Sequence, residues 1–200
     1  MSVYLSGLVL GLSLIMALGP QNVFLLRQGA LRKHAVLSAV ICFVCDLILM
    51  YASVAGLQKV IALHPTFQAV ITWFGVAFLL FYGINTFRQA LRKQKKSIQA
   101  HKSPNRWQIV GLALGFSLLN PHAIIDSLVI IGSGSSQFPE HPQAFLLGVI
   151  SASFLWFTSI TFTSHYFSNV LSKARVWQRI EFSSGTLMVF LGLKLANSLI

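Results

Sequence analysis

Two aspartates lie inside long apolar stretches of the sequence, where an ionised side chain is costly. Asp46 is in the run AVICFVCDLILM and Asp126 is in the run NPHAIIDSLVIIGS, in a chain with only four acidic residues. On membrane-insertion scales an ionised side chain at the centre of a spanning helix costs about 2.5–3.5 kcal/mol. Residues of this kind usually face a cavity and bind ions, protons or a partner. We therefore predict that Asp46 and Asp126 bind a cation or a proton, although Asp126 also fits a solvated position near the membrane surface.

Prolines interrupt the apolar stretches at two places, 19–22 and 120–122. Proline lacks an N–H and disfavours helical geometry at the preceding residue, so each interruption frees backbone carbonyl groups. At membrane depth such groups are tolerated only where they line a cavity or are buried in protein. The predicted helix breaks are Gly19, Pro20 and Pro121, and the candidate binding residues beside them are Gln21, Asn22, Asn120 and His122.

The two amides that follow the first proline have two compatible roles. Gln21 and Asn22 can satisfy the backbone groups that Pro20 frees. They can also bind a polar substrate beside a helix N-terminus, whose partial positive charge attracts a carboxylate. The sequence leaves both roles open.

The elements that position these residues are hydrophobic helices. The chain is 55% hydrophobic and 10% charged, whereas soluble domains are about a quarter charged. A net charge of +11 would suggest nucleic-acid binding in a soluble protein, but these basic residues lie between apolar runs. The composition therefore excludes a soluble enzyme and a nucleic-acid-binding domain.

Six segments are long enough to cross a bilayer, which needs about 20 mostly apolar residues per helix. They lie near 3–26, 36–58, 66–88, 107–131, 143–168 and 178–199. We therefore predict an all-α integral membrane protein with about six transmembrane helices, unless one segment is re-entrant. The expected divisions are a first transmembrane repeat at 1–88, a basic connector at 89–106 and a second transmembrane repeat at 107–200.

The basic residues predict the orientation of these helices. All lysines and arginines except Lys59 and Lys194 lie between spans one and two, three and four, or five and six. The positive-inside rule makes these loops cytoplasmic. Both termini should then face the outer, periplasmic side.

The two halves of the chain resemble each other weakly. Each half has a proline break in its first span, and GVAFLLFYG from Gly75 is echoed by GTLMVFLG from Gly185. Two three-helix halves joined by one cytoplasmic loop must have opposite orientations in the membrane. This predicts an inverted repeat with broken helices 1 and 4, as in many secondary transporters. The simpler alternative is that glycine and proline are common in membrane helices.

Other polar residues have simpler explanations. Cys42 and Cys45 form a C-x-x-C without histidines at zinc-ligand spacing, and we interpret them as small helix residues. Glu181 lies among basic residues near the predicted cytoplasmic end of span six and is left out of the site. Span five is rich in hydroxyl groups, which can line a polar path or bond to helix carbonyls, namely those of Ser151, Ser153, Thr158, Ser159, Thr161 and Thr163. No cofactor or metal site is expected.

Several motifs together suggest a family. These are GPQNVFLLRQG from Gly19, Asp46 followed by LILMY, NPHAIIDSLVIIGS from Asn120, and GVISASFLWF from Gly148. They resemble the lysine/arginine exporter family of bacterial inner membranes, and the GPQN…RQG run favours its basic-amino-acid branch over exporters of neutral amino acids. The resemblance implies export of arginine or lysine from the cytoplasm, with Asn22, Asp46 and Asp126 as functional residues.

The residues suit such a substrate independently. Two carboxylates with almost no buried positive charge favour a guanidinium or ammonium group, and the helix end near Gln21 and Asn22 can receive the substrate carboxylate. We expect a secondary transporter that exchanges its substrate for protons at Asp46, works in a lipid bilayer and is compatible with a homodimer. The alternatives are an exporter of neutral amino acids, an exporter of small cations including metals, and a thiol-redox carrier that uses Cys42 and Cys45.

Overall fold

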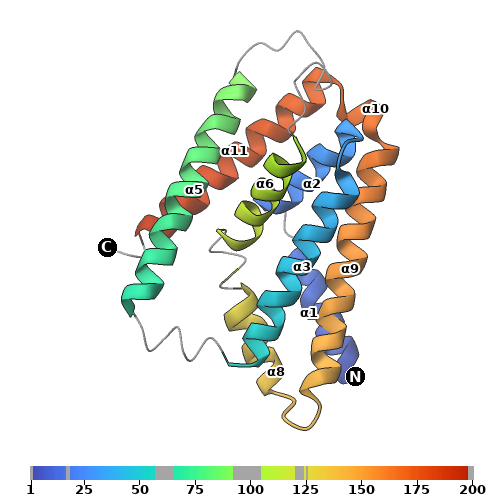
Figure 1. The fold of residues 1–200 in the computed structure, drawn as a ribbon, viewed down its shortest axis with the longest axis vertical. Helices are drawn as coiled ribbons and strands as arrows, with labels where there is room; N and C mark the ends of the chain where they lie inside the picture. The colour runs from blue at the N-terminus through green and yellow to red at the C-terminus, as the bar shows by residue number, and fades with distance from the viewer. Residues whose placement is uncertain are drawn as a thin grey trace.

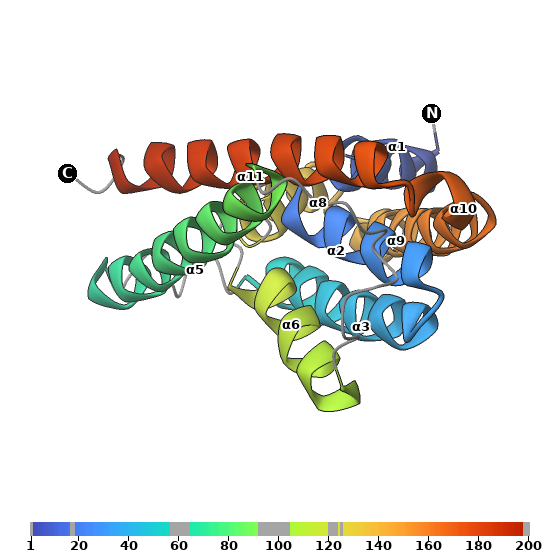
Figure 2. The same ribbon diagram turned by 90° about the horizontal axis from the view of Figure 1, so that it is seen from above.

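The computed structural model describes residues 2–16, 19–56, 65–91, 105–119, 124 and 126–197, and every regular element within them is a helix (Figure 1). Seen from above, α5 lies at one side beside the C-terminal part of α11, whose N-terminal end reaches α10 at the other side (Figure 2). The helices are α1 (Val3–Ile15), α2 (Pro20–Leu31), α3 (Ala35–Val54), α5 (Pro65–Leu91), α6 (Arg106–Leu118), the π-helix η2 (Asp126–Ile131), α8 (Gly132–Ser136), α9 (Pro142–Tyr166), α10 (Ser168–Leu171) and α11 (Ala174–Asn197).

Within the described residues, two helices are long and apolar enough to cross a membrane, α3 with 20 residues and α9 with 25. The pair α1 and α2 adds a third candidate if it counts as one span, bent by 78°. Helices α5 and α11 have similar lengths of 27 and 24 residues. The helical content agrees with an integral membrane protein, while the full set of six spans stays a prediction.

The first predicted span consists of two helices in the structure. Helix α1 ends at Ile15, and α2 starts at Pro20 and continues past residue 26 to Leu31. Arg27, which the sequence placed in a loop, therefore lies on a helix. The fourth predicted span is also divided, because α6 stops at Leu118 and η2 runs from Asp126 to Ile131.

Helix α3 has an outward face and an inward face of opposite character. A stripe of apolar residues at helical spacing is exposed, made up of Val36, Val40, Val44, Ile48 and Tyr51. The opposite face buries the polar residues Ser38, Asp46 and Ser53, together with Cys42, Cys45, Leu49 and Met50. Apolar side chains outside and polar side chains inside are what lipid surroundings require.

Small residues allow the closest helix contacts. Helix α1 packs against α9, and a Cβ atom on Gly7 would overlap the backbone of Phe145, while one on Gly148 would overlap that of Tyr4. Helix α5 packs against α11, where a Cβ on Gly185 would meet the backbone nitrogen of Phe87 at 2.8 Å. Membrane helices commonly approach each other through such residues.

The helix pairing resembles what an inverted repeat would produce. Helix α1, from predicted span one, packs on α9 of span five, and α6 and η2, from span four, pack on α3 of span two. The predicted third and sixth spans, α5 and α11, pack on each other. The pairing agrees with the repeat, which stays a prediction.

Candidate binding site at Asp46

Asp46 lies in the interior where helices α2, α3, α6 and α9 meet. Its side chain is 8% exposed. The Gln21 side chain donates from Nε2 to Asp46 Oδ1 at 3.4 Å, and Ser153 donates from Oγ to Asp46 Oδ2 at 3.0 Å. Both donors are neutral, so they hold the carboxylate in place without cancelling its charge. Such a group can bind a cation or a proton.

Gln21 also joins the two interrupted regions of the chain. Its Nε2 donates to Ser117 Oγ at 3.1 Å as well as to Asp46. Gln21 is the second residue of α2, directly after the first break, and Ser117 is fully buried one residue before α6 ends at Leu118. The start of one helix and the end of another thus meet beside a buried carboxylate.

Asn22 holds the first break together. Its Nδ2 donates to the carbonyl oxygen of Ile15 at 2.8 Å, and its Oδ1 accepts from Trp156 Nε1 at 3.1 Å. Ile15 is the last residue of α1, where carbonyl groups lose their partners within the helix. Of the two roles that the sequence left open, the contacts of Asn22 match the structural one, and those of Gln21 connect it to Asp46.

The local sequence explains this geometry. Gly19 is extended, with φ −85° and ψ 177°, and Pro20 occupies the first position of α2. Proline suits that position because its missing N–H would have no partner within the helix. The helix therefore restarts here, and its positive end lies next to the polar cluster.

The second break is only partly described. Asn120, Pro121 and His122 lie outside the described residues. Asp126 is the first residue of η2, which packs against α3, the helix that carries Asp46. Ser53 of α3 donates to the carbonyl oxygen of Leu128 at 3.2 Å, which satisfies part of the irregular backbone.

The described part of the chain offers little support for a thiol-redox carrier or for an exporter of metals. Cys42 and Cys45 are free and buried within α3, whereas thiol exchange requires an accessible thiolate. No group of three or more histidine, cysteine or acidic residues suited to a metal ion occurs among the described residues.

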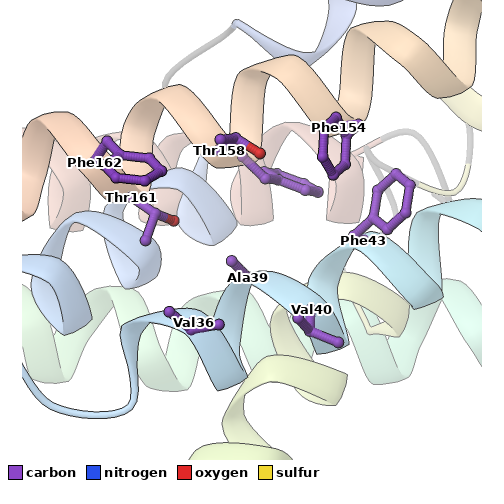
Figure 3. A pocket seen from close by; sticks show the side chains of 9 residues that line it. Val36, Ala39, Val40, Phe43, Phe154, Thr158, Thr161 and Phe162 are labelled. Carbon is purple, nitrogen blue, oxygen red and sulfur yellow. The ribbon is translucent and has the colours of Figure 1, made fainter.

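An apolar groove of about 220 Å³ lies between α3 and α9 (Figure 3). Phe43 and Phe154 face each other in it, with ring centroids 5.7 Å apart. Thr158 and Thr161 supply its only hydroxyl groups among the lining residues. The groove has no charge to offer a polar substrate, so we do not place the binding site there.

The structure adds residues that the sequence did not single out. Ser117 contacts Gln21, and Trp156 contacts Asn22. Glu181, interpreted from the sequence as an ordinary acid near the membrane surface, is instead 4% exposed. A signal for it was present, because Trp177 lies four residues earlier on the same helix face and donates from Nε1 to Glu181 Oε1 at 2.6 Å.

The matches to known proteins cover nearly the whole chain. The family model described as "LysE type translocator" matches residues 12–199. The arginine exporter protein ArgO of Escherichia coli (strain K12) is 36% identical over 198 residues, which are 98% of this chain and 94% of the relative. Its counterpart in Enterobacter sp. (strain 638) is 36% identical, over 98% of this chain and 94% of the relative.

The protein of the same name in Klebsiella pneumoniae (strain 342) is also 36% identical, over 97% of this chain and 93% of the relative. No solved structure matches the chain significantly. With a family model that covers most of the chain and relatives above one-third identity, the chain belongs to the LysE type translocators, a family of transporters and not of enzymes.

Proposed function

We propose that the protein exports arginine, and lysine as a second substrate, from the bacterial cytoplasm in exchange for protons. The relatives named as arginine exporters support the substrate. The proposal places the protein in the inner membrane as six spans in two inverted repeats, with its basic loops in the cytoplasm and its termini in the periplasm.

The observation that carries the proposal is the position of Asp46. A carboxylate that is 8% exposed, held by the neutral groups of Gln21 and Ser153, lies where α2 starts and α6 ends. Transporters with interrupted helices bind their substrates at such points. A carboxylate forms strong, charge-assisted hydrogen bonds with a guanidinium or ammonium group.

Exchange with protons follows from the energetics of export. Moving one positive charge out of a cell with a negative interior costs about 2.3 kcal/mol per 100 mV. Exchange of one substrate cation for one proton removes this electrical term and leaves the concentration gradients as drivers. One carboxylate is sufficient, because a guanidinium nearby disfavours protonation and a proton removes the charge that binds the guanidinium. Asp126 either completes the substrate site or carries a second proton.

Proteoliposomes that contain the purified protein provide the test. Labelled arginine, lysine and a neutral amino acid are compared in counterflow, while a pH-sensitive dye follows protons. We expect arginine and lysine to exchange and to drive proton flux. Counterflow of the neutral amino acid alone, or metal-stimulated flux that ignores arginine, would replace the proposal with one of the alternatives.

The variant Asp46→Asn tests the role of the carboxylate. The amide keeps the shape and can still accept from Gln21, so the protein should fold, but it cannot ionise. We expect arginine-driven proton flux to be lost, while Glu140→Gln, at an exposed turn, behaves as the wild type. Coupled flux in Asp46→Asn at the wild-type rate would refute the mechanism. The variant Cys42→Ser/Cys45→Ser should transport normally, and loss of flux in it would revive the redox carrier.

A further inference from the structure

A second cavity, of about 260 Å³ and with both polar and apolar lining residues, lies between α2, α5, α6 and α11. Pockets for drug-sized ligands span about 300–1,000 Å³, so this volume suits a smaller molecule of amino-acid size. One face of α5 lines it, with Tyr82, Asn85, Thr86 and Gln89 at helical spacing. The lining of the cavity includes charged and amide side chains, which the groove between α3 and α9 lacks.

The cavity has one acid among its lining residues, Glu181. Its side chain is 4% exposed, and the hydrogen bond of 2.6 Å from Trp177 Nε1 fixes one carboxylate oxygen in place. An acid buried on a helix of a membrane protein is costly and usually serves a function. Asp46 does not account for it, because Glu181 lies on a different helix, α11, and lines a cavity whose lining does not include Asp46.

Two buried side chains that line the same cavity as Glu181 have a polar atom without a hydrogen-bond partner among the described residues. Gln28 is 1% exposed and Ser184 is 3% exposed, and both line the cavity. Within the described residues, neither Gln28 Oε1 nor Ser184 Oγ has a hydrogen-bond partner. Buried acceptors without partners are rare and costly. A guanidinium group carries five N–H donors and is the kind of ligand that satisfies several acceptors at once.

The same cavity also contains a cation. Arg27 is one of its lining residues. Arginine side chains bind carboxylates in bidentate geometry. A free basic amino acid carries a carboxylate at one end and a cation at the other, and the cavity supplies partners for both.

Two lining residues of the cavity are sequence neighbours of residues in the Asp46 cluster. Pro20 and Phe116 line it, and the residues that directly follow them, Gln21 and Ser117, are hydrogen-bonded to each other beside Asp46. At its other end the cavity reaches Gln89, near the end of α5, and Trp177, near the start of α11. The positive-inside rule assigns that end to the cytoplasm.

We propose that this cavity is a cytoplasmic loading site for the basic amino acid, occupied before the substrate reaches Asp46. Glu181 and Gln28 bind the guanidinium or ammonium group of the side chain, and Arg27 binds the α-carboxylate. This inference rests on the proposed export of basic amino acids and adds a second binding position to it.

Glu181→Gln tests the loading site in proteoliposomes that contain the whole chain. The amide oxygen can still accept from Trp177, but the charge is removed. We expect the half-saturating concentration of arginine at the cytoplasmic face to rise about tenfold or more, with little change in maximal rate. The value at the outer face should not change, and Glu140→Gln should match the wild type at both faces.

A binding measurement provides a second test. Purified Asp46→Asn protein should still bind labelled arginine, and Asp46→Asn/Glu181→Gln should lose that binding. If Glu181→Gln does not fold, Gln28→Leu, which removes an acceptor from the same site, should raise the cytoplasmic half-saturating concentration in its place.

The outcomes separate the two proposals. If the wild type exports arginine and these substitutions leave the cytoplasmic half-saturating concentration unchanged, Glu181 is structural and the loading site is wrong, while the proposed function stands. Equal shifts at both faces would also overturn the loading site. If the wild type does not transport basic amino acids, the proposed function fails and the loading site fails with it.

Discussion

The contacts of Asn22 allow a quantitative test of how the first helix break is held. Asn22→Ala removes the hydrogen bond of 2.8 Å to Ile15 and that of 3.1 Å from Trp156. Side-chain hydrogen bonds between membrane helices contribute about 0.6 kcal/mol on average and about 1.7 kcal/mol at most. Because Asn22 is only 4% exposed, we expect values in the upper half of that range. The two bonds together then correspond to about 2–3 kcal/mol.

A double-mutant cycle isolates one of these bonds. Trp156→Phe removes the indole N–H and retains an aromatic ring. The free energies of unfolding of both single variants and the double variant, measured by denaturant titration in mixed micelles, should give a coupling of about 1–1.7 kcal/mol. Trp107→Phe is the matched control, because Trp107 is 80% exposed, and it should show no coupling to Asn22→Ala. A coupling below about 0.3 kcal/mol between Asn22 and Trp156 would refute this account of the break.

Three further predictions concern packing, the break itself and topology. Gly148→Ala places a Cβ against the backbone of Tyr4 and should lower the free energy of unfolding by about 1–3 kcal/mol. In the control Gly111→Ala the new Cβ meets nothing within 4 Å, so the free energy of unfolding should stay equal or rise. Equal losses of unfolding free energy in the two variants would contradict the α1–α9 contact. Pro20→Ala should impair arginine flux more than membrane insertion, and normal flux would show the interruption to be incidental. Reporter fusions in the 89–106 connector should register the cytoplasm and fusions at the C-terminus the periplasm, and a cytoplasmic C-terminus would overturn the proposed orientation.

The sequence located the interior acid and the first interruption because each has a local signal. A carboxylate within an apolar run, such as Asp46, and a proline within another, such as Pro20, are unusual whatever surrounds them. The sequence could not assign separate roles to Gln21 and Asn22. Both are amides at the same helix start, and only the positions of Asp46 and Ile15 distinguish them.

Residues with common polar groups were harder to recognise. Serines and tryptophans are frequent in membrane helices, so the roles of Ser117 and Trp156 depend on which helix approaches them. The burial of Glu181 was not expected, because Arg175 and Arg179 lie close to it in the sequence. Its burial depends on the rotation of α11, which places it opposite α2 and α5. The polar stripe from Tyr82 to Gln89 on α5 was the available signal for that cavity.

The two hydrogens on the Gln21 amide nitrogen link ligand binding at Asp46 to the position of α6. A side-chain amide nitrogen has two hydrogens, and in this structure Gln21 directs that nitrogen to both Asp46 and Ser117. A ligand that takes the lone pair of Asp46 Oδ1 used by Gln21 competes with one of these hydrogens. The released amide can then turn, and its hold on the end of α6 changes with it. Ligand binding at Asp46 Oδ1 in this way alters the contact between the start of α2 and the end of α6.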